Sequence, residues 1–228
     1  MDKPQLTTVA QDYIKVVWGM QEWSAQPVTT KDLSDRLGVG ASTVSETVRR
    51  LASQGLLEHE RYGAISLTEL GRTHALEMVR RHRLLETFLV SQLGYTWDEV
   101  HDEAEILEHA VSDLMIDRID QKLEYPTRDP HGDPIPSKAL TMDRPNARPL
   151  ALLAQGERGV VARFSDEDPE VLRYFADIGF GLDTTVTITS VNQAVGIMEI
   201  HWDNGTTQSD NLTLGLVAAH AVWIEKSQ

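Results

Sequence analysis

The sequence predicts a mainly α-helical fold with a small β component: an N-terminal winged helix-turn-helix, a helical middle region and a small C-terminal β-barrel. Helix-period apolar segments interrupted at Gly38 and followed by a hairpin pattern predict the first part. A helix-spaced run of His and Glu at 101–109 indicates the second, and short alternating apolar segments after residue 147 indicate the third. The expected domains are 1–78, 79–146 and 147–228.

The composition is that of an ordinary globular protein, with 41% hydrophobic and 25% charged residues among 228. This length suits one large domain or two to three small ones. No apolar run approaches the roughly 20 residues that span a bilayer, so we expect no membrane partner. The chain has no cysteine, which excludes a disulfide framework and fits a cytoplasmic location.

The net charge of −14 is unfavourable for nucleic-acid binding, but the charges are unevenly distributed along the chain. Residues 1–85 carry 11 Lys and Arg against 10 Asp and Glu, whereas 86–149 carry 6 against 14 and 150–228 carry 4 against 11. The N-terminal third can therefore approach phosphates. Divalent ions bound in the middle region would remove further negative charge.

Three helices and a hairpin are expected in the N-terminal third. Apolar side chains recur at helical spacing over 8–23, and a short helix over 31–37 is ended by Gly38. After a tight turn, another helix is expected over 42–53. Residues 56–68 then alternate around a turn and predict a β-hairpin. Helix, turn, helix and hairpin in this order make a winged helix-turn-helix.

In such a unit the second helix of the turn enters the major groove with its N-terminal residues leading. Hydroxyl side chains there can bond phosphates or base edges, and arginines can neutralise phosphates. Small hydroxylated residues also favour helix starts for purely local reasons, so each of them has a structural interpretation as well. The whole pattern favours binding of double-stranded DNA. The candidate DNA-contacting residues are Thr8, Ser42, Thr43, Ser45, Glu46, Arg49, Arg50 and, on the hairpin tip, Arg61.

The run at 101–109 gathers metal-binding side chains on one helical face. At about 100° per residue, His101, Glu105, Glu108 and His109 fall within roughly a 100° arc. Like charges crowded at helical spacing repel unless something neutralises them, and a divalent cation does this well. The opposite arc is apolar and is expected to pack on a core; it comprises Val100, Ala104, Leu107, Ala110, Val111, Leu114 and Met115.

A second pair, His82 and Glu86, repeats the i,i+4 spacing on an earlier apolar segment. An isolated Glu/His face is often no more than solvated surface, but two such faces within about thirty residues favour a metal site. Oxygen and imidazole ligands without thiolate favour manganese, iron(II) or zinc over copper(I) or an iron–sulfur cluster. Structural zinc is disfavoured because cysteine is absent.

The Pro-rich stretch up to Pro136 cannot continue a helix, and a lone His131 in this loop is expected to be solvated. The remainder to Pro149 is expected to be a linker. Beyond it, several short strand-like segments suggest a small barrel. One helix is expected to begin at Asp168-Pro169, with an inward face of Val171, Leu172, Tyr174 and Phe175.

The winged helix-turn-helix followed by Arg81-His-Arg-Leu-Leu-Glu86 and His101-Asp-Glu-Ala-Glu-Ile-Leu-Glu-His109 resembles the diphtheria-toxin-repressor family of metal-dependent transcription regulators. Asp129-Pro-His-Gly-Asp-Pro-Ile-Pro136 is similar to a Pro/Gly segment of that family. The resemblance covers essentially the whole chain and implies that the C-terminal barrel is SH3-like (FeoA-like).

This resemblance implies two metal positions. The primary site would take Asp12, Glu105, Glu108 and His109. The ancillary site would take His82, Glu86 and His101, with Asp166 as an acidic candidate from the barrel. The next partner expected from the family falls at Pro169, which has no side-chain donor.

Two positions bear on the choice of metal. Iron-responding members of the family carry Met where Asp12 stands and Cys where Glu105 stands, and manganese-responding members carry Asp and Glu. Carboxylate oxygens in place of sulfur favour the harder ion, Mn²⁺, with Fe²⁺ as the alternative. Compact two-metal manganese regulators place a Glu where this chain has Lys15, and they lack the barrel, so two separated sites are implied.

The implied function is a manganese-dependent repressor that binds operator DNA as a metal-activated homodimer and controls metal-uptake genes. An iron(II)-dependent repressor of the same family is the alternative. From a different class, a carboxylate-bridged metalloenzyme would also use Glu and His on paired helices, but this chain has few long helices from which to build the bundle. A regulator that uses its acidic sites as structural staples and senses a ligand through the barrel is a further rival.

Overall fold

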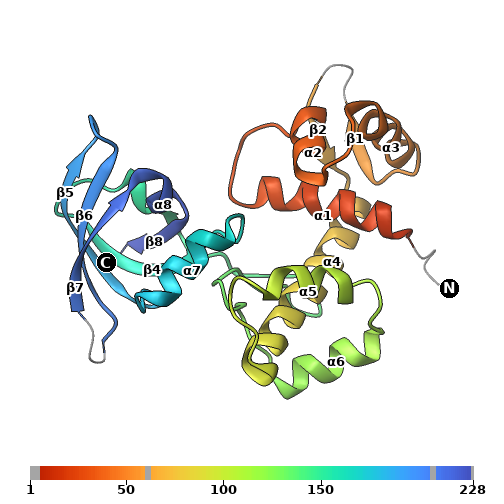
Figure 1. Cartoon of the computed structure of the whole chain (residues 1–228). Coiled ribbons are helices and arrows are strands. Elements are labelled where there is room, and N and C mark those ends of the chain that lie inside the picture. Colours follow the sequence, from red (N-terminus) through yellow and green to blue (C-terminus); the bar gives the residue numbers. More distant parts are fainter. Residues whose placement is uncertain (1–5, 60–62, 206–208, 227–228) are drawn as a thin grey trace. The chain divides into compact units, whose positions relative to one another are not determined.

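The computed structural model describes residues 6–59, 63–205 and 209–226 (Figure 1). Backbone contacts divide the chain into two compact units. The first unit runs to His82 and includes Pro136–Thr141. The second unit comprises Arg83–Ile135 and the chain from Met142 onward. Among the described residues, no helix is both long enough and apolar enough to cross a membrane.

The first unit contains the predicted helix-turn-helix and hairpin. Its elements are α1 (Thr8–Glu22), α2 (Thr30–Leu37), α3 (Ala41–Ser53), β1 (Leu57–His59), β2 (Ile65–Leu67) and the first part of α4 (Glu69–Phe88). Strands β1 and β2 pair antiparallel, with Glu58 opposite Ser66. This order confirms the winged helix-turn-helix expected from the sequence.

Local chemistry explains where α2 begins and ends. Thr29 caps its N-terminus in a capping box, because the Thr29 hydroxyl accepts from the Asp32 amide and the Asp32 carboxylate accepts from the Thr29 amide. Gly38 ends the helix in the left-handed conformation, with φ of 65°. Helix α3 then buries one face, which consists of Val44, Thr47, Val48 and Leu51.

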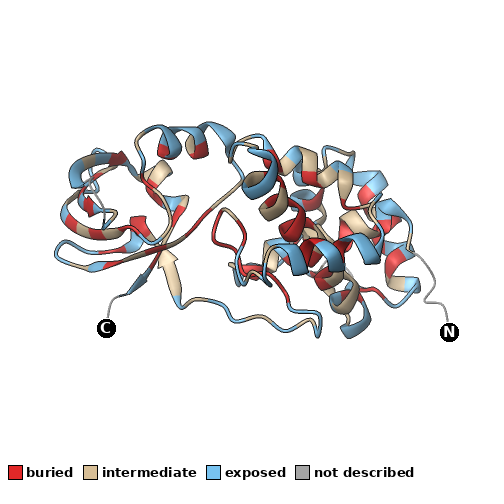
Figure 2. Ribbon diagram, turned by 90° about the horizontal axis from the view of Figure 1, so that it is seen from below, coloured by how far each residue is buried: buried red, intermediate tan, exposed pale blue. Residues whose placement is uncertain are grey.

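The helical part of the second unit continues from α4 through a π-helical turn, η1 (Leu89–Leu93), to α5 (Val100–Leu107) and α6 (Asp113–Lys122). Buried apolar residues on these elements form one core, as the red inner faces of the helices in Figure 2 illustrate. Its members are Leu84, Leu85, Leu89, Val100, Ala104, Ile116, Ile119 and Ile135.

The apolar arc predicted from Val100 to Met115 holds only in part: Val111 packs against the core, but Ala110, Leu114 and Met115 are exposed. Helix α5 ends at Leu107, and Ser112 caps a new helix by accepting from the Met115 amide. The intervening turn resets the helical phase, so that Leu114 and Met115 are 67% and 47% exposed. Val100 and Ala104, which precede the break, are buried as predicted.

The Pro-rich stretch that precedes the predicted linker is buried over residues 131–136. The Asp129 carboxylate accepts from the backbone amides of His131 and Asp133, each at 2.9 Å, and the Asp129 amide donates to the Asp133 carbonyl. This Asx-type turn satisfies polar backbone groups that would otherwise need water. The prediction that His131 is solvated is therefore wrong.

The C-terminal part is a six-stranded antiparallel sheet in the order β3-β8-β4-β5-β6-β7. The strands are β3 (Ala147–Pro149), β4 (Arg158–Phe164), β5 (Thr185–Asn192), β6 (Ile197–Asp203), β7 (Ser209–Gly215) and β8 (Val222–Lys226). Three helices accompany them: η2 (Leu150–Leu152), α7 (Pro169–Asp177) and α8 (Leu216–His220). Strand β4 bulges against β8 between Val161 and Arg163.

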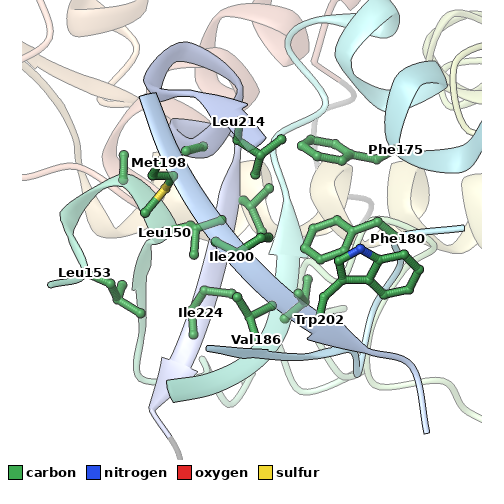
Figure 3. Packing of buried hydrophobic residues seen from close by; sticks show 14 of the residues in the cluster. Leu150, Leu153, Phe175, Phe180, Val186, Met198, Ile200, Trp202, Leu214 and Ile224 are labelled. Atoms are coloured by element: carbon green, nitrogen blue, oxygen red, sulfur yellow. The ribbon is translucent and has the colours of Figure 1, made fainter. Parts of the chain in front are cut away.

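Aromatic rings fill one end of the sheet core (Figure 3). Phe164 lies 5.3 Å from Phe175 and 5.9 Å from Phe180, and Phe180 lies 5.7 Å from Trp202, measured between ring centroids. These separations suit tilted and edge-to-face packing. Tyr174, predicted to pack inward, is instead 41% exposed, whereas Val171, Leu172 and Phe175 of α7 pack on the core as predicted.

Candidate metal centres and DNA-binding surface

Helix α3 presents its polar side chains to solvent. Ser42, Thr43, Glu46, Arg49 and Arg50 are exposed, as a groove-reading face requires. The structure places these predicted residues on one helix, α3. Thr8, at the start of α1, is exposed as well, whereas Arg61 lies outside the described residues.

Ser45 differs from its neighbours because it is half-buried and already engaged. Its hydroxyl donates to the Ala41 carbonyl at 2.9 Å. This is the local role that a hydroxylated residue near a helix start often has. The role of Ser45 in DNA contact stays a prediction.

The second unit brings together three residues expected at the ancillary site. Nδ1 of His101, on α5, lies 3.3 Å from Oε1 of Glu86 and 3.4 Å from Oδ2 of Asp166. Glu86 comes from α4 and is 1% exposed, and Asp166 follows the end of β4. The helices and the barrel thus bring Asp166 together with two of the residues predicted for the ancillary site.

His131, which was expected to be solvated, joins this group. It is 1% exposed, and ligand atoms of Glu86, His131 and Asp166 lie within 4.8 Å of one another. We call Glu86, His101, His131 and Asp166 the acid–imidazole cluster. Asp129 two residues before His131, with Gly132 between prolines, is the sequence pattern of a tight polar turn that could have indicated an ordered histidine.

The hydrogen bonding of His131 fits a metal ligand. Its Nε2 lies 3.1 Å from the Trp97 carbonyl, which can only accept, so this nitrogen is the donor. Its Nδ1 is buried and has no hydrogen-bond partner among the described residues. A ligating histidine commonly donates its other ring N–H to a carbonyl in this way. In the neutral imidazole that donates from Nε2, Nδ1 carries the lone pair and is the atom that would bind a metal.

Electrostatics around the cluster also fit a dication. Burial, together with the carboxylates of Asp133 and Glu86, raises the pKa of Asp129 to about 8. Burial lowers the pKa of His131, but Glu86, Asp129 and Asp166 raise it by more, so that the net shift is upward. Burial and Glu86 oppose ionisation of Asp166, yet His101, His131 and Arg163 hold its pKa below the usual value. Crowded buried acids of this kind are stabilised by a bound cation.

The residues expected at the primary site lie around the end of α5. Glu108, the C-cap residue, is 1% exposed, and its Oε1 lies 3.5 Å from Nε2 of His109. Oε1 of Glu105 lies 3.6 Å from Nε2 of His101. Because the other ring nitrogen of His101 faces Glu86, this one side chain contacts residues of both predicted ligand sets.

The other two predicted ligands, Asp12 and His82, lie on helices α1 and α4. Asp12 lies on α1 of the first unit and is half-buried. His82 is buried on α4, one helical turn before Glu86. The i,i+4 spacing puts His82 and Glu86 on one face of that helix, as the sequence predicted.

Three protein-family models match the chain. The iron dependent repressor N-terminal DNA binding domain matches residues 5–65, and the iron dependent repressor metal binding and dimerisation domain matches residues 68–137. The FeoA domain matches residues 148–226.

Among curated relatives, the iron-dependent repressor IdeR of Mycobacterium tuberculosis is 31% identical over 97% of this chain and 99% of its own. Among solved structures, a manganese-dependent transcriptional repressor in complex with manganese is 53% identical, with a TM-score of 0.91 over 96% of this chain and 100% of the other. Another manganese-dependent transcriptional repressor is 45% identical, with a TM-score of 0.75 over 95% and 100%.

Proposed function

Because this chain belongs to the iron-dependent repressor family, which includes the diphtheria toxin repressor, we propose that it is a manganese-dependent repressor that binds operator DNA as a homodimer. Family membership makes it a metal-dependent, DNA-binding and dimerising regulator, and not an enzyme. The observation that carries manganese is the ligand chemistry: every candidate ligand is a carboxylate or an imidazole, in a chain without cysteine. Such a regulator would act in the cytoplasm, where its operators are, on genes of metal uptake.

We assign the primary site to Asp12, Glu105, Glu108 and His109. Glu108 and His109 are adjacent at the end of α5 and already lie within 3.5 Å of each other. Three carboxylates and one imidazole form a set of hard and borderline donors, which suits Mn²⁺ and offers no soft sulfur to copper(I). Asp12 is the donor that we assign from α1, on the basis of the family resemblance.

The ancillary site takes His82, Glu86, His101 and Asp166, to which we add His131. The support for His131 is its burial, its Nδ1 lone pair and its short separation from Glu86 and Asp166. The family's next expected ligand falls at Pro169, which has no side-chain donor. In this assignment His131, from the loop before β3, supplies the missing donor. The domain limits at 78/79 and 146/147 remain our proposal for how the chain is divided.

The bound ion supplies positive charge that offsets the mutual repulsion of the carboxylates. Asp12 precedes the DNA-reading helices, whereas Glu105, Glu108 and His109 belong to the region matched as a dimerisation domain. When both groups share one ion, α3 is held in one orientation relative to the dimer axis. Two recognition helices must stand about 34 Å apart, or a multiple, to read two half-sites together. Occupancy of the site therefore shifts an ensemble toward the DNA-binding conformation.

The decisive experiment measures operator affinity as a function of metal. Purified protein is stripped with a chelator and titrated with labelled operator DNA, followed by fluorescence anisotropy, with and without Mn²⁺, Fe²⁺, Zn²⁺ or Co²⁺. We expect Mn²⁺ to tighten binding by a factor of 10 or more, in the usual range of allosteric coupling. His109→Ala should abolish this effect without changing the circular dichroism of the metal-free protein. Equal affinity with Mn²⁺ and with chelator would refute the proposal.

The same titration separates the rivals. Tightest binding with Fe²⁺ would identify the iron-responsive alternative. Operator affinity that is unchanged by every metal but changes with a peptide or small molecule would identify the other rival. That regulator would sense a ligand through its barrel and use the acidic sites as structural staples.

A further inference from the structure

A buried row of charges lies beside the acid–imidazole cluster. Nε and Nη2 of Arg163 lie 2.8 and 2.9 Å from the two carboxylate oxygens of Asp133. Nη2 of Arg83 lies 3.7 Å from Oδ1 of the same carboxylate. We call Arg83, Asp133 and Arg163 the ion-pair row; all three are at least nine-tenths buried.

The row and the cluster draw on the same three segments. Helix α4 supplies Arg83 to the row and Glu86 to the cluster, and the strand β4 with its following residues supplies Arg163 and Asp166. The loop after α6 supplies Asp133 and His131. In each segment, the row residue stands two or three positions from the cluster residue, so fixing one fixes the backbone that carries the other.

Further contacts hold the three segments at these positions. Nη1 of Arg83 donates to the Pro134 carbonyl at 2.7 Å, and the Phe164 amide donates to the His131 carbonyl at 2.8 Å. Gly132, with φ of 95°, lies so close to β4 that a Cβ would stand 2.2 Å from the Ala162 carbonyl oxygen. The loop is thus pressed against the strand where the row crosses between them.

Buried charges are a costly way to gain stability, since apolar residues of similar volume often do as well or better. Their retention makes most sense where a defined geometry is needed. A second pair joins the same loop to the barrel at much lower cost. Arg128 contacts Asp183 with two hydrogen bonds, and both side chains are largely exposed. Attachment of the loop to the barrel therefore does not by itself require the buried row.

We propose that the Arg83–Asp133–Arg163 row is a positioning element that sets Glu86, His131 and Asp166 at ligating distance before a cation arrives, and so sets the affinity of the ancillary site. Asp133 is the key positioning residue, because its carboxylate contacts both arginines. This inference rests on the ancillary site of the proposed function.

The test compares Asp133→Asn with Asp183→Asn in the full chain. Both changes remove one carboxylate charge from an Arg–Asp pair between the loop and the barrel, and Asn tolerates the left-handed backbone of Asp183, whose φ is 64°. Binding of Mn²⁺ to metal-free protein is measured by electron paramagnetic resonance of the free ion. We expect two classes of site in the wild type and in Asp183→Asn. In Asp133→Asn the ancillary class should weaken by about 10- to 100-fold while the primary class is unchanged.

A purely structural role would act differently. It would lower the melting temperature of the metal-free protein and weaken both classes of site together, and that outcome would overturn the proposal. Unchanged affinity of both classes in Asp133→Asn would overturn it too. If that variant does not fold, Arg163→Lys, which keeps the charge and loses the planar two-point contact, is judged by the same criteria.

Glu86→Gln distinguishes failure of the positioning role from failure of the ancillary site itself. Loss of one Mn²⁺ class in Glu86→Gln, with wild-type binding in Asp133→Asn, contradicts the positioning role alone. Two intact classes in Glu86→Gln would instead contradict the ancillary site itself, and the positioning role with it.

Discussion

Asp12 and Glu105 are the two oxygen donors on which the preference for manganese depends in our proposal. Replacing them together, Asp12→Met with Glu105→Cys, introduces two soft sulfur donors into the primary site. We expect the double variant to need less Fe²⁺ and more Mn²⁺ for half-maximal operator binding than the wild type. Anaerobic anisotropy titrations with each ion measure the shift. Retained preference for Mn²⁺ would show that these two side chains do not set selectivity.

Arg49 and Arg50 are exposed on α3 and belong to the proposed DNA surface. Arg49→Ala should weaken operator binding and lower the slope of log affinity against log salt by about 1, if its guanidinium neutralises one phosphate. Mn²⁺ binding, measured without DNA, should not change, which distinguishes loss of a contact from loss of activation. An unchanged salt slope would remove Arg49 from the interface.

For single residues, the sequence predicted proximities that follow from helical spacing, and it did not predict those that depend on tertiary contacts. His101 and Glu105 are a helical turn apart, so their proximity follows from the helix alone. His131 has no periodic partner, and it is held by an Asx turn and by a hydrogen bond from Phe164 of β4, 33 residues later. Apart from the tight-turn pattern of Asp129 and Gly132, nothing in the sequence distinguishes this histidine from a solvated one.

Helix α4 shows how closely two elements can approach. Gly71, in its first turn, is buried against the strand that begins the hairpin, where a Cβ would lie 1.9 Å from the Leu56 carbonyl oxygen. Gly71→Ala should therefore destabilise the protein by about 1–3 kcal/mol, although alanine is the better helix former. Urea denaturation followed by circular dichroism measures the change.

Gly19 provides the matched control for that variant. It lies inside α1, and beyond its own helix backbone no atom of the described residues stands within 4 Å of where its Cβ would be. Gly19→Ala should leave stability unchanged or raise it by up to about 1 kcal/mol, because alanine restricts the unfolded chain. Equal effects of the two substitutions would contradict the account of the helix–hairpin contact.

Element boundaries were predictable where a residue type imposes them. Gly38 and the Thr29 capping box mark both ends of α2 in the sequence itself. The break after Leu107 carries neither Gly nor Pro, so the helical pattern of 101–109 gave no sign that Leu114 and Met115 would point to solvent. Strand β7 and the five-residue α8 were not predicted, since neither has a sufficiently distinct apolar pattern.

For the molecule as a whole, metal binding and folding are linked. Carboxylates that repel in the metal-free protein are neutralised in the loaded one, and any ligand that binds only the folded state stabilises it. At a concentration of Mn²⁺ 100 times its Kd, the stabilisation is about 2.7 kcal/mol per site. For a chain of this length, the melting temperature should rise by roughly 5–10 °C.

Differential scanning fluorimetry with Mn²⁺, with Mg²⁺ and with chelator measures this shift. Mg²⁺ is the control, since it dehydrates reluctantly and is held poorly by imidazole. Glu108→Gln should reduce the shift given by Mn²⁺. A melting temperature that is the same with Mn²⁺ and with chelator would contradict the linkage.

The bulge in β4 changes which of the later residues of the strand face the interior of the barrel. Along a regular strand, Val161 and Arg163 would face the same side, and the guanidinium would enter the aromatic interior of the barrel. Ala162 is the extra residue against β8, so Val161 and Phe164 both face inward while Arg163 emerges over the Trp223 ring. If the same sequence paired with β8 without the bulge, inside and outside would be exchanged from Arg163 onward. The bulge, and not simple alternation, therefore decides which way the cation of this strand faces.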